Sequence, residues 1–204
     1  MNKGLLIVIS GPSGAGKGTI YSQIIKRTDM KRSVSVTTRQ PRPGEVEGVN
    51  YYFRTEEQYQ QMIAAGDFLE TAEVYHNLYG TPKAPVFENM KNGYNVLFEV
   101  DVHGVRSIKK KYPEAVAIFI MTPDFKTLEQ RLRARGTETE DSLKIRLGAA
   151  RRELSEYKLF DYIVFNDEVD LAIDEVLDII TAEKRKIINN EEKIQALLAE
   201  QDEE

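Results

Sequence analysis

The sequence predicts an α/β fold with a parallel sheet core flanked by helices. Two observations support this prediction. Runs of apolar, often β-branched residues recur at 5–9, 95–100, 115–121 and 162–165, and helical patterns separate them. All-apolar runs are typical of strands buried on both faces, as in parallel sheets. The alternation of such strands with helices indicates a doubly wound arrangement.

The first half of the chain predicts one helix and a small insertion. A helical pattern covers about 16–27, directly after a glycine-rich turn. Residues from about 33 to 83 predict a mixed α/β insertion, in which Thr55 and Gln58 form the capping box of a helix. Its expected strands are 33–38, 51–53 and 68–75.

The second half predicts a helix, a polar flap and a C-terminal amphipathic helix. Thr122 is the expected N-cap of a helix that runs to Arg135 and stops at Gly136. Residues from about 134 to 152 are rich in charged groups and poor in large apolar ones, which indicates a flap over something charged. Apolar residues at nearly helical spacing over 169–198 predict one long or broken helix.

The composition is that of an ordinary globular protein of one or two domains. The 204 residues are 41% apolar and 30% charged, which excludes collagen-like and wholly disordered chains. The net charge of −5 argues against non-specific binding to nucleic acid, because such binding needs positive surface. The chain has no cysteine and two histidines, which excludes disulfides, thiolate chemistry and a histidine-rich metal cluster.

No apolar run is long enough to predict a membrane span. The longest is 115–121, whereas a transmembrane helix needs about 20 residues. The run 5–9 is too short for a signal peptide, and Gly-Pro follows it where a cleavage motif should be. We therefore expect a cytoplasmic protein with no membrane and no nucleic-acid partner.

A phosphate-binding loop lies between the first strand and the first helix. The pattern G-x-x-x-x-G-K in this context is a P-loop, whose backbone amides and helix N-terminus bind phosphate. Gly18 stands where a hydroxyl residue usually follows the lysine, so the nearest hydroxyl for Mg²⁺ is that of Thr19. The expected ATP-binding residues of the loop are Gly11, Pro12, Ser13, Gly14, Ala15, Gly16, Lys17, Gly18 and Thr19.

A P-loop alone does not separate nucleotide kinases from GTPases. Residues 101–104 fit the GTPase pattern D-x-x-G after a buried strand, but no N-K-x-D motif follows. A second phosphate site is indicated by Arg39 and Arg42 in a loop with proline and glycine, because planar guanidinium groups bind phosphate oxygens in pairs. Tyr51 could add a hydroxyl donor to this site.

Four separated segments, 11–19, 35–51, 68–81 and 135–142, resemble the guanylate kinase family in their motifs and order. The resemblance extends from about residue 4 to about residue 185. It implies a kinase of purine nucleotide metabolism that converts ATP and GMP to ADP and GDP with Mg²⁺. By this resemblance, 35–83 is the GMP-binding insertion, 134–152 is a helical lid, and 1–34, 84–133 and 153–204 form the core of one unit.

The family roles of the GMP site carry over to matching positions. A carboxylate only accepts hydrogen bonds, so Glu70 can take the adjacent N1–H and N2–H₂ donors of guanine, whereas adenine offers no such pair. The Thr81 hydroxyl can donate to O6. The resemblance assigns the GMP phosphate to Arg39, Arg42, Tyr51 and Tyr79, and the base to Ser35, Glu70, Thr81 and Asp101.

Two acids and three arginines complete the expected site. Glu99 and Asp101 are two apart at a strand end and share one face; Asp101 is a plausible contact to the base, and either acid could instead orient water around Mg²⁺. The resemblance makes Arg131, Arg135 and Arg146 the lid arginines that act with Lys17 on the phosphates. It also indicates Asn166, after the last strand, near the adenine of ATP.

Two other functions stay open. One is a guanylate-kinase-like module that binds phosphopeptides without catalysis, which typically has a degraded P-loop or lid. The other is a kinase for a different nucleoside monophosphate, and Glu70 with Thr81 is the feature that discriminates against it. The sequence leaves a homo-oligomer open.

Overall fold

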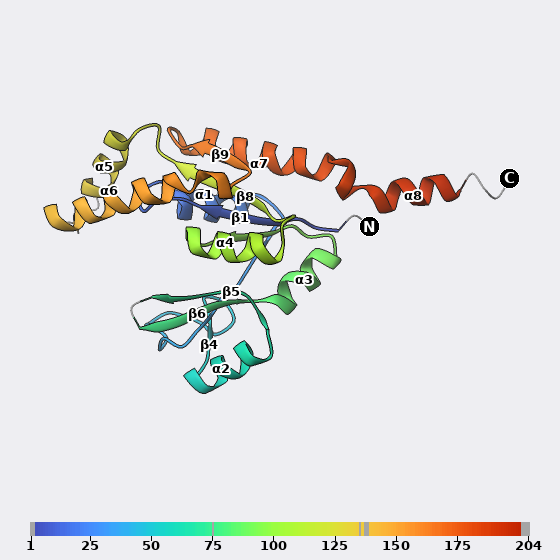
Figure 1. The fold of residues 1–204 in the computed structure, drawn as a ribbon, viewed down its shortest axis with the longest axis horizontal. Helices are drawn as coiled ribbons and strands as arrows, with labels where there is room; N and C mark the ends of the chain where they lie inside the picture. Colours follow the sequence, from blue (N-terminus) through green and yellow to red (C-terminus); the bar gives the residue numbers. More distant parts are fainter. Residues whose placement is uncertain (1–2, 75, 135, 137–138, 201–204) are drawn as a thin grey trace.

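A parallel five-stranded sheet forms the core of the protein (Figure 1), as predicted. The computed structural model describes residues 3–74, 76–134, 136 and 139–200. All neighbouring strands of this sheet pair in parallel. In spatial order the strands are β2 (Lys31–Arg32), β7 (Val96–Glu99), β1 (Leu6–Ser10), β8 (Val116–Met121) and β9 (Tyr162–Phe165).

Helices cover both faces of the sheet because successive residues of β1 point to opposite sides. Ile7 and Ile9 lie in one buried cluster with residues of α1 (Lys17–Arg27) and α7 (Val169–Arg185). Leu6 and Val8 lie in a second cluster with residues of α3 (Lys83–Lys91) and α4 (Val102–Lys111). The all-apolar sequence of β1 is therefore explained by burial on both faces.

The segment expected to be a polar flap is largely helical. It contains most of α6 (Glu140–Ser155), which packs against α5 (Phe125–Ala134) through a third buried cluster that includes Leu128, Leu132 and Leu143. The expected N-cap at Thr122 is wrong by two residues: the Asp124 carboxylate accepts from the Thr127 amide, and α5 begins at Phe125. A short 3₁₀ helix, η1 (Tyr157–Leu159), leads to β9.

A second, mixed sheet lies below the core in Figure 1. Its order is β4 (Tyr52–Phe53), β3 (Val36–Thr37), β6 (Asn77–Pro82) and β5 (Phe68–Val74). Helix α2 (Glu56–Ala64) covers it, with the predicted capping box of Thr55 and Gln58. Strand β6 was not expected, because its glycine and proline weaken the strand pattern.

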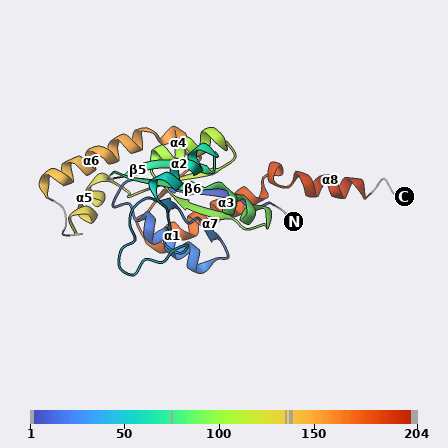
Figure 2. The ribbon, with the colours of Figure 1, turned by 90° about the horizontal axis from the view of Figure 1, so that it is seen from below.

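The chain ends in two helical segments beyond α7. These are η2 (Ile187–Asn189) and α8 (Glu191–Ala199), so the predicted amphipathic helix is broken. Figures 1 and 2 both show α8 extending away from the sheet, at the end opposite α5 and α6. Within the described part of the chain, every helix is too short or too polar to span a membrane.

Candidate functional site

The P-loop turns sharply between β1 and α1, and two of its glycines are required there. Gly11 has φ 140°, and an added Cβ would lie 2.0 Å from the carbonyl oxygen of Ile120 on β8. Gly16 has φ 92°, and an added Cβ would lie 2.2 Å from the amide nitrogen of Asn166. Any side chain at either position would both strain the backbone and collide with a neighbour.

Lys17 is the first residue of α1, so its ammonium and the free amides of the helix N-terminus lie at the same end of the loop. Its Nζ donates to the carbonyl oxygen of Pro12 at 3.0 Å, which holds the side chain back across the loop. Amides, helix dipole and lysine together make this end of α1 suited to a polyphosphate.

Asn166 lies behind the P-loop, where its side chain contacts the loop backbone. The residue directly follows β9, its backbone amide donates to Met121 at 2.7 Å, and its side chain is fully buried. The side-chain amide donates to the carbonyl oxygen of Ala15 at 2.7 Å. Because the side chain is shielded from solvent, Asn166 can influence a nucleotide through the position of the P-loop.

A cleft of about 830 Å³ opens over the loop. Acidic side chains from two elements enter it beside Lys17: Glu99 ends β7, and Asp101 caps α4 by accepting from the Gly104 amide at 2.8 Å. Thr19 also lines the cleft. These hydroxyl and carboxylate oxygens are the kind of ligand that Mg²⁺ takes, usually through water and with the phosphates as its other partners.

Glu153 of α6 is a further acid in this cleft, and sequence reasoning missed it. Partial burial raises the pKa of its carboxyl group; nearby Lys17 lowers the pKa, and Asp101 raises it. The sequence does contain an indication of Glu153, because this residue lies seven positions after Arg146 and would share a helix face with it.

The two described arginines of the expected lid make different contacts. Arg146 on α6 donates to the hydroxyl of Ser13 at 3.1 Å, so it reaches the P-loop. Arg131 on α5 donates to the carbonyl oxygen of Asp167 at 3.1 Å, just beyond Asn166. Arg135 lies outside the described residues. The two described arginines thus approach the P-loop from the side of α5 and α6.

A second cavity, of about 280 Å³, adjoins the cleft between the two sheets. Both are lined by Tyr51, Glu99 and Val100, so a ligand in one can meet a ligand in the other. Ser35 and Thr81, the expected contacts to the base, both line the second cavity. Its other lining residues are Tyr21, Arg32, Ser33, Asn50 and Phe98.

Glu70 and Thr81 form a buried pair at the edge of this cavity. The Thr81 hydroxyl donates to a Glu70 carboxylate oxygen at 2.6 Å, and both residues are buried. Burial raises the pKa of the Glu70 carboxyl group; the Thr81 bond lowers it, Asp101 raises it and Lys111 lowers it. The Thr81 hydroxyl was expected to donate to a ligand, but in this structure it holds the carboxylate.

Arg39, Tyr51 and Tyr79 come together as expected. The Arg39 guanidinium lies 5.4 Å from the ring centre of Tyr51, and the two tyrosine rings meet edge to face at 5.9 Å. Sequence reasoning missed Glu45, whose carboxylate accepts two bonds from Arg39, at 2.8 and 3.0 Å, and one from the backbone amide of Arg42 at 2.7 Å. The Arg42 side chain is exposed.

Comparison with known proteins supports one family. The guanylate kinase family model matches residues 3–183. The chain is 48% identical over 187 residues to the guanylate kinase of Carboxydothermus hydrogenoformans, covering 91% of this chain and 92% of that protein. It is 47% identical over 188 residues to the guanylate kinase of Clostridioides difficile, covering 92% of each. The crystal structure of guanylate kinase from Anaplasma phagocytophilum superposes with a TM-score of 0.71 at 30% identity, over 91% of this chain and 89% of that one.

The raised pKa of Glu70 predicts a pH-dependent cost to stability. In the folded state Glu70 keeps its proton at pH values where the unfolded chain has released it. This group therefore lowers the free energy of unfolding increasingly as pH rises above about 4.5. Glu70→Gln stays neutral. We expect the free energy of unfolding of the variant to rise relative to that of the wild type between about pH 4 and pH 7, measured by urea unfolding. The matched control is Glu73→Gln on the same strand, where the side chain is 62% exposed; a gap that stays constant with pH would contradict the prediction.

Proposed function

The chain belongs to the guanylate kinase family, and we infer that it transfers the γ-phosphoryl group of ATP to GMP, giving ADP and GDP. One observation carries the inference: the P-loop cleft and the cavity beside Glu70 share Tyr51, Glu99 and Val100. Two nucleotides bound in these spaces would have their phosphates facing each other. In-line transfer between nucleotides requires this arrangement.

We propose that the P-loop binds the phosphates of ATP. Backbone amides of 11–19 and the N-terminus of α1 supply donors, and Lys17 supplies a cation near the β and γ phosphates. The oxygens of Thr19, Glu99 and Asp101 fit a Mg²⁺ ion that is held mainly by phosphates and water. When bound, Mg²⁺ neutralises charge that develops on the phosphates. Asn166 would act on ATP indirectly, by fixing the carbonyl of Ala15.

GMP would bind between the second sheet and the core, in the proposed insertion 35–83. When ionised, Glu70 would accept hydrogen bonds from guanine N1–H and N2–H₂. These bonds would compensate the buried carboxylate for its lost hydration. Thr81 either keeps orienting Glu70 or rotates its hydroxyl toward O6. Ser35 and Asp101 complete the proposed base contacts.

The phosphate of GMP would be bound by Arg39, Arg42, Tyr51 and Tyr79. Glu45 already accepts from Nη2 of Arg39, and the Gln40 carbonyl oxygen accepts from Nη1, so the phosphate would take the remaining donors of Arg39 or displace the carboxylate. The second possibility makes Arg39 available only when a dianion competes for it. Either way, charge-assisted bonds to a guanidinium group are stronger than neutral ones.

Closure of the proposed lid, 134–152, would bring Arg146 and Arg135 to the transferring phosphoryl group, with Arg131 near the donor. The catalytic demand is electrostatic, since phosphoryl transfer needs positive charge at the equatorial oxygens and exclusion of water. An intact Lys17, and Arg146 already at the P-loop, favour an enzyme over a phosphopeptide-binding module. Because the proposed substrates are ATP and GMP, we also propose that the protein acts in the cytoplasm, in purine nucleotide metabolism.

The function is tested by measuring ADP release with a panel of nucleoside monophosphates. We expect GMP to be phosphorylated at least about 10³-fold more efficiently than AMP, CMP or UMP, because sites built from buried polar pairs reject analogues by as much as ~10⁴–10⁵. Similar rates with two or more of the panel would contradict the proposal. Binding of a phosphopeptide without ADP release would support the non-catalytic alternative.

Replacement of Lys17 tests the electrostatic role of the P-loop. Lys17→Ala should lower kcat by at least about 10²-fold, the usual cost of a lost electrostatic group in a transition state. Lys26→Ala, an exposed lysine on the same helix, is the matched control and should keep its rate. A Lys17→Ala enzyme with near-normal kcat and a normal circular dichroism spectrum would remove Lys17 from the mechanism.

Replacement of Asn166 tests whether this residue positions the P-loop. Asn166→Ala leaves the Ala15 carbonyl without its side-chain donor, and an unsatisfied buried group costs about 1–3 kcal/mol. We expect kcat/KM for ATP to fall about tenfold, which corresponds to about 1.4 kcal/mol, while KM for GMP stays within twofold. Asn89→Ala, which also loses a side-chain bond to a backbone carbonyl but on α3, should change neither. Equal losses for both substrates would indicate general destabilisation instead.

A further inference from the structure

The last described residues form an arm that stands away from the catalytic unit. We define the C-terminal arm as residues 187–200, that is η2, α8 and Glu200. Figures 1 and 2 show from two directions that it extends beyond the sheet and its covering helices. The guanylate kinase family model matches residues 3–183, so the arm lies beyond the matched segment.

The arm exposes apolar side chains to solvent. Ile187 is 70% and Ile188 68% exposed, and Leu197 and Leu198 are each 54% exposed. Ile194, Leu197 and Leu198 have the i, i+3, i+4 spacing of one helix face. An isolated helix of fewer than about 12–15 residues is marginal in water, and α8 has nine. A cluster of exposed apolar residues on such a helix indicates an interaction surface.

The sequence of the arm is complementary to itself when two copies run antiparallel. With the two-fold axis between Glu192 and Lys193, Ile187 lies opposite Leu198 of the second copy, and Ile188 lies opposite Leu197. In the same register Arg185 lies opposite Glu200, and Glu192 lies opposite Lys193. These two apolar pairs and these two pairs of opposite charge suit an isologous interface, in which each pair occurs twice. Ile194 is the exception among the apolar residues of the arm, because it lies opposite Glu191.

We propose that the C-terminal arm is the interface through which two copies of this chain associate, antiparallel and about a two-fold axis. Charge complementarity selects a second copy as the occupant, because the basic end of α7 and the acidic end of the arm are each other's partners. The arm extends from the end of the molecule opposite α5 and α6 (Figures 1 and 2), so association through it leaves the site of each protomer uncovered.

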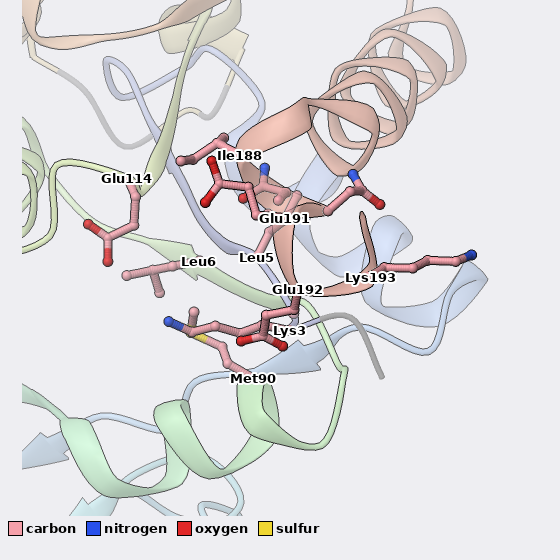
Figure 3. Close-up of a pocket in the computed structure, with 12 residues that line it drawn as sticks. Lys3, Leu5, Leu6, Met90, Glu114, Ile188, Glu191, Glu192 and Lys193 are labelled. Atoms are coloured by element: carbon pink, nitrogen blue, oxygen red, sulfur yellow. The ribbon is translucent and has the colours of Figure 1, made fainter. Parts of the chain in front are cut away.

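The base of the arm offers further contact area. A cavity of about 280 Å³ lies there, with Leu5, Leu6 and Met90 in its wall and Ile188 at its edge (Figure 3). Lys193 points away from the rest of this cavity in Figure 3, toward solvent, where a second copy can meet it. A nine-residue helix is only about 14 Å long, so the interface is smaller than the usual ~1,600 Å², and we expect association in the micromolar range.

The test is sedimentation equilibrium of the full chain at concentrations from about 1 to 500 μM. We expect the average mass to rise from that of one chain toward that of two. Leu197→Glu with Leu198→Glu should weaken dimerisation at least tenfold. Leu171→Glu is the matched control, since Leu171 is 58% exposed on the first turns of α7, and it should dimerise like the wild type. All variants should keep their kinase activity, which also shows that they fold.

A charge exchange tests the antiparallel register. Arg185→Glu should weaken dimerisation at low salt, and Arg185→Glu combined with Glu200→Arg should restore it. A chain that stays monomeric at 500 μM, or a dimer that Leu197→Glu with Leu198→Glu leaves intact, would overturn the proposal; failure of the charge exchange to restore association would overturn the register. A chain that dimerises as expected but does not phosphorylate GMP would refute the proposed function and leave this inference standing.

Discussion

Backbone amides can surround a phosphate only where the chain turns tightly. In this protein that turn is the P-loop, which packs directly against β8 and the residue that follows β9. Gly11 approaches the backbone of β8, and Gly16 lies against the Asn166 side chain that follows β9. Asn166 is itself anchored by its amide bond to Met121 at the end of β8. The shape of the P-loop therefore depends on the parallel register of β1, β8 and β9. A shift of either outer strand would remove the support for the loop, whatever the residues of the loop itself.

The charges around this loop are balanced rather than simply positive. Lys17 and the start of α1 share the cleft with Glu99, Asp101 and Glu153. In the proposed function these acids would repel a bare triphosphate and favour one that arrives with a divalent cation, because the interaction of close charges is strong in a partly dry cleft. The buried Glu70 is a different case. Burial disfavours its charged form, and the Thr81 bond and Lys111 offset part of that cost.

Several features of the site escaped sequence reasoning because they depend on distant segments. Glu45 follows Arg39 by six residues, and only the folded loop places its carboxylate on that guanidinium group. Glu153 enters the cleft because α6 packs on α5. Its spacing from Arg146 indicates a shared helix face, but the direction of that face depends on this packing. Strand β2 has two residues, and strand β6 contains glycine and proline; such segments become strands by pairing, not by their own propensity.

The class of fold, the P-loop and the order of the motifs can all be predicted from the sequence. These follow from local information: the apolar runs of β1, β7 and β8, the spacing of Gly11, Gly16 and Lys17, and the capping box at Thr55. The contacts between side chains depend on how the whole chain packs. That packing joined Thr81 to Glu70, put Asn166 behind the P-loop instead of in the cleft, and left the C-terminal arm uncovered. Local patterns specify backbone conformation, whereas contacts between residues far apart in the chain depend on the packing of the whole sheet.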